Sequence, residues 1–134
     1  MPAIYMVQTM ADYTAKHIKD MEAAYGGGFV KARAELGVSS FGMQIIRMPP
    51  DNDAYPEHDH SKDGQEEVYV TLAGSGWIDV DGERVDIDKD TLVRVGAGAK
   101  RKVHSGPQGL EILALGGCPG EPYSIPGFSE LTAA

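Results

Sequence analysis

Residues 56–76, PEHDHSKDGQEEVYVTLAGSG, place two histidines and a carboxylate next to a run of strand-forming residues that ends in a glycine turn. His58 and His60 are one residue apart, so in an extended chain both imidazoles point to the same face, as metal ligands often do. The following EEVYVTLAG is rich in β-branched and aromatic residues and is bounded by turn residues. A strand is therefore predicted to begin at Glu66 or Glu67 and to bring a carboxylate toward the histidines.

Similar short runs rich in Val, Ile and Leu surround this stretch and are separated by Gly, Pro and Asp. They are FGMQIIRMPP, EEVYVTLAG, WIDVDGERVDI, TLVRV and LEILAL. Several short strands with turn signals between them indicate an antiparallel sandwich or barrel. Asp81 and Gly82 predict a two-residue hairpin, because the primed turn needs positive φ at both positions. Gly74 and Gly76 predict a second tight corner.

The N-terminal region has a different pattern, which predicts a short helix over residues 9–25. Its apolar residues recur at spacings of three and four, the period of one helical face. Thr9 could cap the helix, and residues 26–28, all glycine, would end it. His17 lies on the apolar stripe and is more often a packed core residue than a ligand. The next segment, FVKARAELG, fits either a helical turn or a strand.

The region from Pro56 to Leu115 resembles the two motifs of the cupin superfamily. In the first motif a His-x-His pair is followed by a Glu and, after six further residues, by a Gly. His58, His60, Glu67 and Gly74 match it, with a gap between His60 and Glu67 two residues longer than usual. The count to Gly74 assigns the carboxylate ligand to Glu67 rather than Glu66.

The second cupin motif, Pro-x-Gly-x-x-His, is degraded in this chain. Gly96 stands in place of the proline, Gly98 matches the glycine, and Arg101 occupies the position of the histidine. The fourth ligand that the resemblance leads one to expect is therefore absent. His104 could substitute for it only if a bulge reset the strand phase, because it is three residues from Arg101 and faces the other way in a regular strand.

The resemblance implies an all-β fold, a double-stranded antiparallel β-barrel or jelly roll with a short N-terminal helix, in a small single-domain cupin of the conserved-barrel type. We expect residues 1–134 to form one domain. Residues 1–40 would hold the helix and lead-in, residues 41–116 the barrel core, and residues 117–134 an irregular C-terminal wrap. A length of 134 residues suits a single core.

Charge and cysteine content exclude several kinds of partner. The net charge of −8 argues against nucleic acid and anionic membranes, because such binding rests on clustered Lys and Arg. The one basic run, residues 100–102, is interpreted as a solvated face. Cys118 is the only cysteine and is interpreted as a structural thiol, and the start MPAIYMVQTM has no basic or long apolar run. These features predict a cytoplasmic protein.

The leading hypothesis is a cupin-like protein that binds one divalent transition metal (Fe, Mn, Zn, Ni or Cu) through His58, His60 and Glu67. Two imidazoles and one carboxylate leave positions on the metal for water, oxygen or a substrate. A small organic molecule would occupy the barrel pocket, for which the sequence suggests the lining residues Tyr69, Thr71, Arg101 and Trp77. The resemblance implies oxygenation or isomerisation, and no catalytic residue is singled out.

Two alternatives remain open at this level. In one, the protein is a metal-free binding or sensing module in which Arg101 forms a bidentate pair with Glu67 and takes the place of the cation. In the other, it is a structural dimer with a filled barrel. A homodimer is expected in general, because an N-terminal segment such as AIYMVQ, residues 3–8, could add to a partner's sheet.

Overall fold

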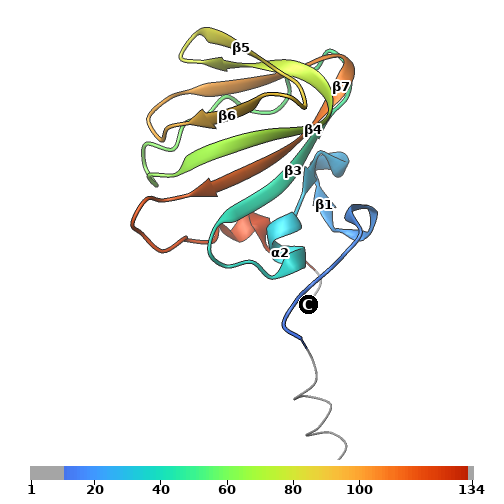
Figure 1. The fold of residues 1–134 in the computed structure, drawn as a ribbon, viewed down its shortest axis with the longest axis vertical. Coiled ribbons are helices and arrows are strands. Elements are labelled where there is room, and N and C mark those ends of the chain that lie inside the picture. Colours follow the sequence, from blue (N-terminus) through green and yellow to red (C-terminus); the bar gives the residue numbers. More distant parts are fainter. Residues whose placement is uncertain (1–10, 133–134) are drawn as a thin grey trace, which may run out of the picture.

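The structure, a computed structural model, describes residues 11–132 and consists mainly of antiparallel strands (Figure 1). The strands are β1 (Ala23–Ala24), β2 (Phe29–Val30), β3 (Gly42–Met48), β4 (Glu66–Val80), β5 (Glu83–Ile87), β6 (Leu92–Val95) and β7 (Arg101–Gly117). The helical segments are η1 (Ile18–Asp20), η2 (Tyr25–Gly27), α2 (Ala32–Leu36) and η3 (Gly127–Ser129). Among the described residues, no helix has the length and apolar character needed to cross a membrane.

The strands form one antiparallel sheet in the order β1-β2-β3-β7-β4-β5, with β6 also paired to β4. The long strands β4 and β7 pair along both of their halves; the first half of β4 also pairs with β6 and the second with β5. The predicted antiparallel β fold is confirmed, but within residues 11–132 the sheet is open rather than closed into a barrel. On one side the sheet ends in the two-residue strands β2 and β1. Strands this short have too few backbone N–H and C=O groups to pair with a further strand.

The predicted corner at Gly74 and Gly76 is wrong, because both glycines lie inside β4. The pairing of β4 with β7 shifts register between Thr71 and Ala73 and again between Gly74 and Gly76. At both glycines the backbone of β7 comes too close for a side chain to fit. The strand therefore bends at these bulges and continues.

The predicted hairpin at Asp81 and Gly82 is confirmed. These two residues join β4 to β5, and their φ angles are 48° and 86°. Both values lie in the left-handed region that a primed turn requires. Local turn chemistry therefore determined this connection.

The predicted helix over residues 9–25 is wrong for the part of it that the structure describes. Residues 11–17 form no regular element, η1 is one short turn, and Ala23–Ala24 pair with β2 as strand β1. His17 is exposed and its Nδ1 accepts a hydrogen bond from the amide of Lys19. Sheet pairing thus overrides the helical pattern. Thr9, Met10 and the segment 3–8 lie outside the described residues.

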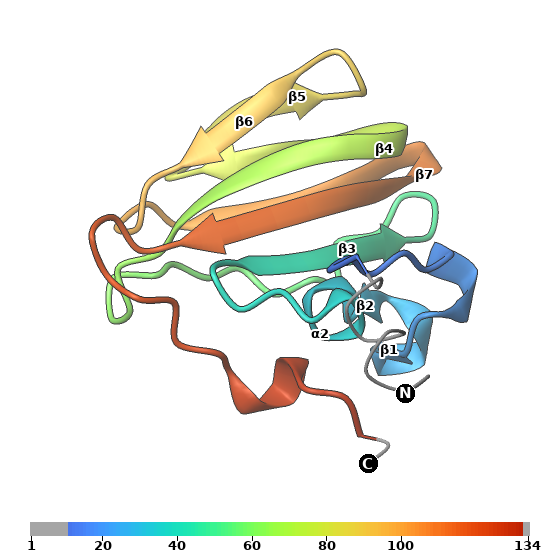
Figure 2. The same cartoon turned by 60° about the horizontal axis from the view of Figure 1, so that its bottom comes forward.

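The ambiguous segment FVKARAELG contains both of its predicted elements. Its first two residues form β2, and α2 follows and ends at Gly37, whose φ of 78° is the left-handed value typical of a helix end. Lys31, between the two elements, is buried and bonds the Glu22 carboxylate and the carbonyl of Glu130. This contact fastens the C-terminal segment, which runs back from β7 toward β1 and α2 (Figure 2).

The hydrophobic core is formed by apolar side chains that strands β3, β4, β5, β6 and β7 contribute. They are Ile46, Met48, Tyr69, Ile78, Ile87, Val95, Val103, Leu110, Ile112 and Ala114. The largest fully buried side chain, however, is that of Arg101 at the start of β7. A buried guanidinium requires polar partners, and these lie at the candidate site described next.

Candidate metal centre and adjoining cavity

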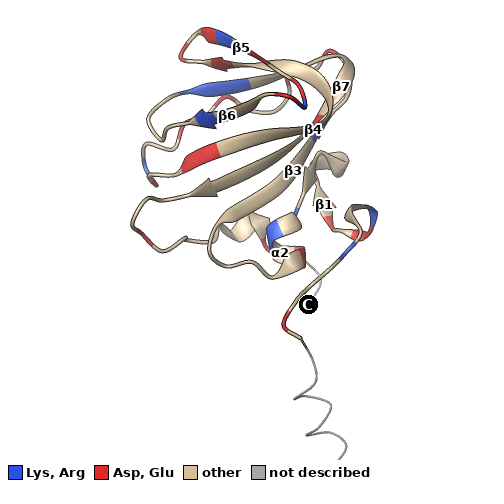
Figure 3. Ribbon diagram, viewed as in Figure 1, with Lys and Arg blue, Asp and Glu red and all other residues tan. Residues whose placement is uncertain are grey.

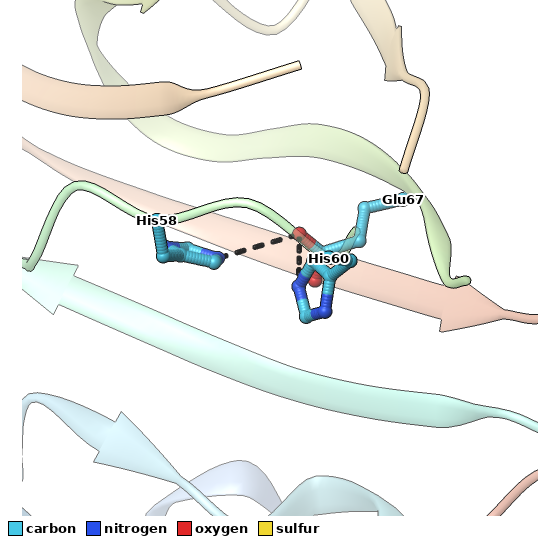
Figure 4. A group of neighbouring side chains, drawn as sticks. All are labelled: His58, His60 and Glu67. Atoms are coloured by element: carbon cyan, nitrogen blue, oxygen red, sulfur yellow. Dashed lines mark ion pairs between the residues drawn. The ribbon is translucent and has the colours of Figure 1, made fainter. Parts of the chain in front are cut away.

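His58, His60 and Glu67 converge on one point (Figure 4). The two histidines lie in the loop between β3 and β4, and Glu67 is the second residue of β4. Backbone hydrogen bonds join His58 to Arg101 in both directions and link the amide of His60 to the carbonyl of Ala97. The loop is therefore held against the chain leading into β7. One potential ligand atom from each of the three side chains lies within 4.8 Å of the others.

Hydrogen bonds at the outer ring nitrogens orient both imidazoles. Nδ1 of His58 lies 3.0 Å from the carbonyl oxygen of Pro56, and Nδ1 of His60 lies 3.0 Å from Oδ1 of Asp63. Because both oxygens accept hydrogen bonds, the ring protons are assigned to Nδ1 and the lone pairs to Nε2. The Nε2 atoms lie 3.6 Å (His58) and 3.2 Å (His60) from Oε1 of Glu67.

This geometry fits a bound cation. Nε2 of His60 is buried and has no hydrogen-bond partner among the described residues, although a carboxylate oxygen lies close to it. With both ring protons on Nδ1, the lone pairs on Nε2 face Oε1 of Glu67 and repel it. A second proton on Nε2 of His60, whose pKa Glu67 raises, or a divalent ion held by all three side chains would remove this repulsion. The Asp63 carboxylate behind His60 is the partner that metal-binding histidines commonly have.

Glu67 is charged despite its burial. Burial raises the pKa of Glu67, but the two imidazoles and the Tyr69 hydroxyl, which donates a 2.7 Å hydrogen bond to Oε1, outweigh it and hold the pKa well below its usual range. The neighbouring Glu67 and, to a lesser degree, Asp63 raise the pKa of His60 against the effect of burial. Burial likewise raises the pKa of Asp63, and the contacts with His60 and Gln65 outweigh it and lower the pKa.

Arg101 shares the same carboxylate oxygen. Its Nη1 donates to Oε1 of Glu67 at 3.1 Å, its Nη2 donates to the carbonyl of Gly96 at 2.7 Å, and its Nε has no hydrogen-bond partner in the described part of the chain. The predicted pair with Glu67 therefore exists, but with one carboxylate oxygen rather than two. Glu66, the alternative ligand, points away and pairs with Arg94 at 2.7 Å.

A cavity of about 640 Å³ adjoins the three residues. Its walls come from the segment 25–29, strand β3, the loop before β4 and η3. The lining residues are Tyr25, Gly28, Phe29, Gln44, Ile46, Arg47, Met48, Pro49, Asn52, Ala54, Tyr55, Pro56, His58, His60, Glu67 and Phe128. Sequence reasoning missed most of them, although the alternation of Gln44, Ile46 and Met48 along β3 is a signal for one lining face.

The described residues that line this cavity do not include the four suggested from the sequence. Tyr69 and Arg101 contact Glu67 from within the core, and Thr71 is buried on the same strand. Trp77 stacks on His104 with ring centroids 4.8 Å apart. His104 bonds Asp79 at 3.0 Å and takes no part in the cluster with Glu67.

The basic run 100–102 is not the solvated face that the sequence suggested. Lys100 is exposed, but Arg101 is fully buried, and Lys102 donates hydrogen bonds to the carbonyls of Asp53 and Tyr55. Lysines and arginines lie on several separate elements of the chain (Figure 3). Lys102 thus supports the loop that carries His58 and His60.

Comparison with solved structures identifies proteins of similar fold. A cupin protein from Bacteroides fragilis aligns over 93% of this chain and 100% of its own, with a TM-score of 0.69 and 18% identity. A sugar phosphate isomerase of the cupin superfamily from Silicibacter pomeroyi aligns over 77% and 74%, with a TM-score of 0.63 and 17% identity. A cupin domain of a transcriptional regulator from Enterobacter cloacae aligns over 66% and 87%, with a TM-score of 0.51 and 20% identity. No protein-family model and no curated protein sequence matches the chain.

Proposed function

Because the chain has the cupin fold, we propose that it binds one divalent transition metal through His58, His60 and Glu67 and a small organic molecule in the adjoining cavity. The observation that carries this proposal is the buried Nε2 of His60, which has no hydrogen-bond partner within residues 11–132 and faces a charged carboxylate. Bound there, such a metal supplies Lewis acidity and open positions for a substrate oxygen. Asp63 and the Pro56 carbonyl hold the two imidazoles in the required tautomer.

The reaction that we propose for such a site is oxygenation or isomerisation of the bound molecule. Three protein ligands leave room for the oxygenation or isomerisation expected from the sequence. The neighbour from Silicibacter pomeroyi is described as an isomerase, which favours isomerisation of the two, although a shared fold supports many reactions. The homodimer and the cytoplasmic location stay predictions from the sequence.

Metal binding is expected to raise the melting temperature of the protein. Fe(II), Mn(II), Zn(II) or Ni(II) added to metal-free protein at about one hundred times Kd would stabilise the folded state by about 2.7 kcal/mol. Differential scanning fluorimetry measures the shift, and elemental analysis of untagged protein should give about one equivalent of metal. His58→Ala should abolish both effects, because it removes one of three ligands.

His17→Ala is the matched control for that variant. His17 is exposed and lies outside the cluster, so its replacement should leave metal uptake unchanged. Equal uptake by the His58→Ala and His17→Ala proteins would contradict the proposed ligand set.

Asp63→Asn is expected to weaken metal binding by about 10–100-fold with little loss of fold, because it removes the charge that orients His60 and increases its basicity. Competition with a chromophoric chelator measures the affinity. Asp59→Asn provides the comparison, since in the described part of the chain the Asp59 side chain bonds only Ser61, and its replacement should change the affinity less than about threefold. Similar losses in the two variants would show that Asp63 has no special role.

The contact between Arg101 and Glu67 favours a second candidate, a metal-free binding or sensing module. In that case the guanidinium already satisfies Glu67. The neighbour from Enterobacter cloacae is a cupin domain within a transcriptional regulator, which is consistent with a sensing role. Metal contents below about a tenth of an equivalent after reconstitution with each ion would favour this candidate over the first.

A further inference from the structure

We propose that the ligand of the cavity is an apolar monocarboxylate, with its carboxylate at the His58, His60 and Glu67 end and an aromatic or branched hydrocarbon group against Phe29 and Phe128. This inference rests on the proposed metal site and names the class of molecule that binds beside it. Two observations support it: the composition of the cavity walls, and the balance of charge at the inner end of the cavity, which is the end at His58, His60 and Glu67.

A row of three aromatic side chains extends along one part of the cavity. The ring centroids of Tyr25 and Phe29 are 6.2 Å apart, and those of Phe29 and Phe128 are 5.7 Å apart. Phe29 is 6% exposed, whereas Phe128 is 59% and Tyr25 78% exposed. Two large aromatic side chains are therefore left partly in water at the rim, where a ligand's hydrocarbon group could cover them.

The backbone at this rim is strained. Tyr25 has a φ of 55°, a left-handed value that is uncommon for residues other than glycine, and Gly26 and Gly27 follow with φ of 69° and 95°. Strain of this kind persists where the surrounding structure maintains it, and it is frequent at ligand sites. It holds the Tyr25 ring beside Phe29 at the edge of the cavity.

The walls provide little for a sugar phosphate. Away from the inner end, the polar side chains in the lining are Gln44, Asn52, Arg47 and the tyrosine hydroxyls. Asn52 is bonded to the amide of Ala54. Arg47, which is the one lysine or arginine among the described residues of the lining, pairs with Glu111 at 3.1 Å. A ligand with many hydroxyls and a phosphate would lose more hydrogen bonds to water than these groups could replace.

Charge at the inner end selects an anion only when the metal is present. Glu67 and the Arg101 that bonds it carry opposite charges, and Asp63 lies on the far side of His60 with half of its side chain exposed. With neutral imidazoles the inner end therefore has no net charge, and a divalent ion would add two positive charges. The carboxylate of a ligand should be attracted by metal-loaded protein and not by metal-free protein, whereas a neutral ligand of the same shape should bind both alike.

Isothermal titration calorimetry with three probes tests the proposal: hydrocinnamate, its neutral analogue hydrocinnamamide, and ribose phosphate. We expect the metal-loaded protein to bind hydrocinnamate at least about tenfold more tightly than the metal-free protein does. The affinity for hydrocinnamamide should differ less than about threefold between the two forms. Tighter binding of ribose phosphate than of hydrocinnamate by the loaded protein would overturn the proposal.

Phe128→Ala should weaken the binding of both aromatic probes by about threefold or more, because it removes apolar surface from the rim. Phe41→Ala is its control, since Phe41 is also exposed but does not line the cavity. Equal affinities in the two variants would contradict the assignment of the hydrocarbon subsite. If the protein takes up no metal, the metal proposal fails, and the response of hydrocinnamamide binding to these two variants still decides whether the walls recognise an apolar group.

Discussion

Arg101→Leu is expected to lower the free energy of unfolding of the metal-free protein by about 3–5 kcal/mol, the usual cost of removing one partner of a buried ion pair. Arg101 is fully buried and Glu67 is 4% exposed, so the variant would leave a carboxylate in the core without its cationic partner. Urea denaturation followed by circular dichroism measures the change. Added metal should recover part of the loss, because a divalent ion at Glu67 would replace the missing positive charge.

Arg94→Leu is the matched control for this change. The Arg94 and Glu66 side chains are 2.7 Å apart but 64% and 39% exposed, so breaking this pair should cost less than about 1 kcal/mol. The double variant Arg101→Leu with Glu67→Gln should regain stability relative to Arg101→Leu alone, because no buried charge is left unpaired. A cost for Arg101→Leu no larger than that for Arg94→Leu would show that the buried pair does not stabilise the fold.

Gly74→Ala is expected to lower the free energy of unfolding by about 2–5 kcal/mol, for two physical reasons. Gly74 has a φ of 75°, where a side chain is strained. A Cβ at this position would also overlap the carbonyl oxygen of Gly109 and lie 2.8 Å from its carbonyl carbon. Both contacts are with backbone atoms of β7, so relief requires movement of the strand. Urea denaturation measures the loss.

Two other glycines separate these contributions. Gly82 has a φ of 86° but nothing within 4 Å of its Cβ position, so Gly82→Ala should show the backbone strain alone, about 1–2 kcal/mol. Gly98 has neither a positive φ nor a close neighbour, and Gly98→Ala should be neutral within about 0.5 kcal/mol. Equal losses for Gly74→Ala and Gly82→Ala would rule out the close approach of β4 and β7 at the bulge.

Arg101 connects these stability predictions with the proposed metal site. It lies at the position where the second cupin motif has a histidine, and it contributes a charge to Glu67 instead of a ligand. Its partner Gly96 occupies the position of the motif's proline, and the Gly96 carbonyl oxygen accepts a hydrogen bond from Nη2 of Arg101. The departures from the motif at these two positions are thus in direct contact.

Local patterns in the sequence were sufficient for the antiparallel strands, the hairpin at Asp81–Gly82 and the pairing of His58 with His60, whereas the choice of Glu67 over Glu66 came from the cupin resemblance. Alternation with period two, the φ requirement of a primed turn and the His-x-His spacing each involve residues that are neighbours along the chain. Such cues do not depend on which other segment lies alongside. They could therefore be read before any tertiary contact was known.

Only the tertiary structure decided the contacts between distant segments. The pairing of Ala23–Ala24 with β2 replaced a helix that the local period favoured. The sequence offered a pair between Arg101 and Glu67, 34 residues apart, as one alternative, but the single carboxylate oxygen that Arg101 contacts depends on the register of β7. Phe29 and Phe128 line one cavity because the C-terminal segment folds back onto β2. Register, sheet order and chain reversal are set by the summed burial and hydrogen bonding of the whole fold, which no short stretch of residues contains.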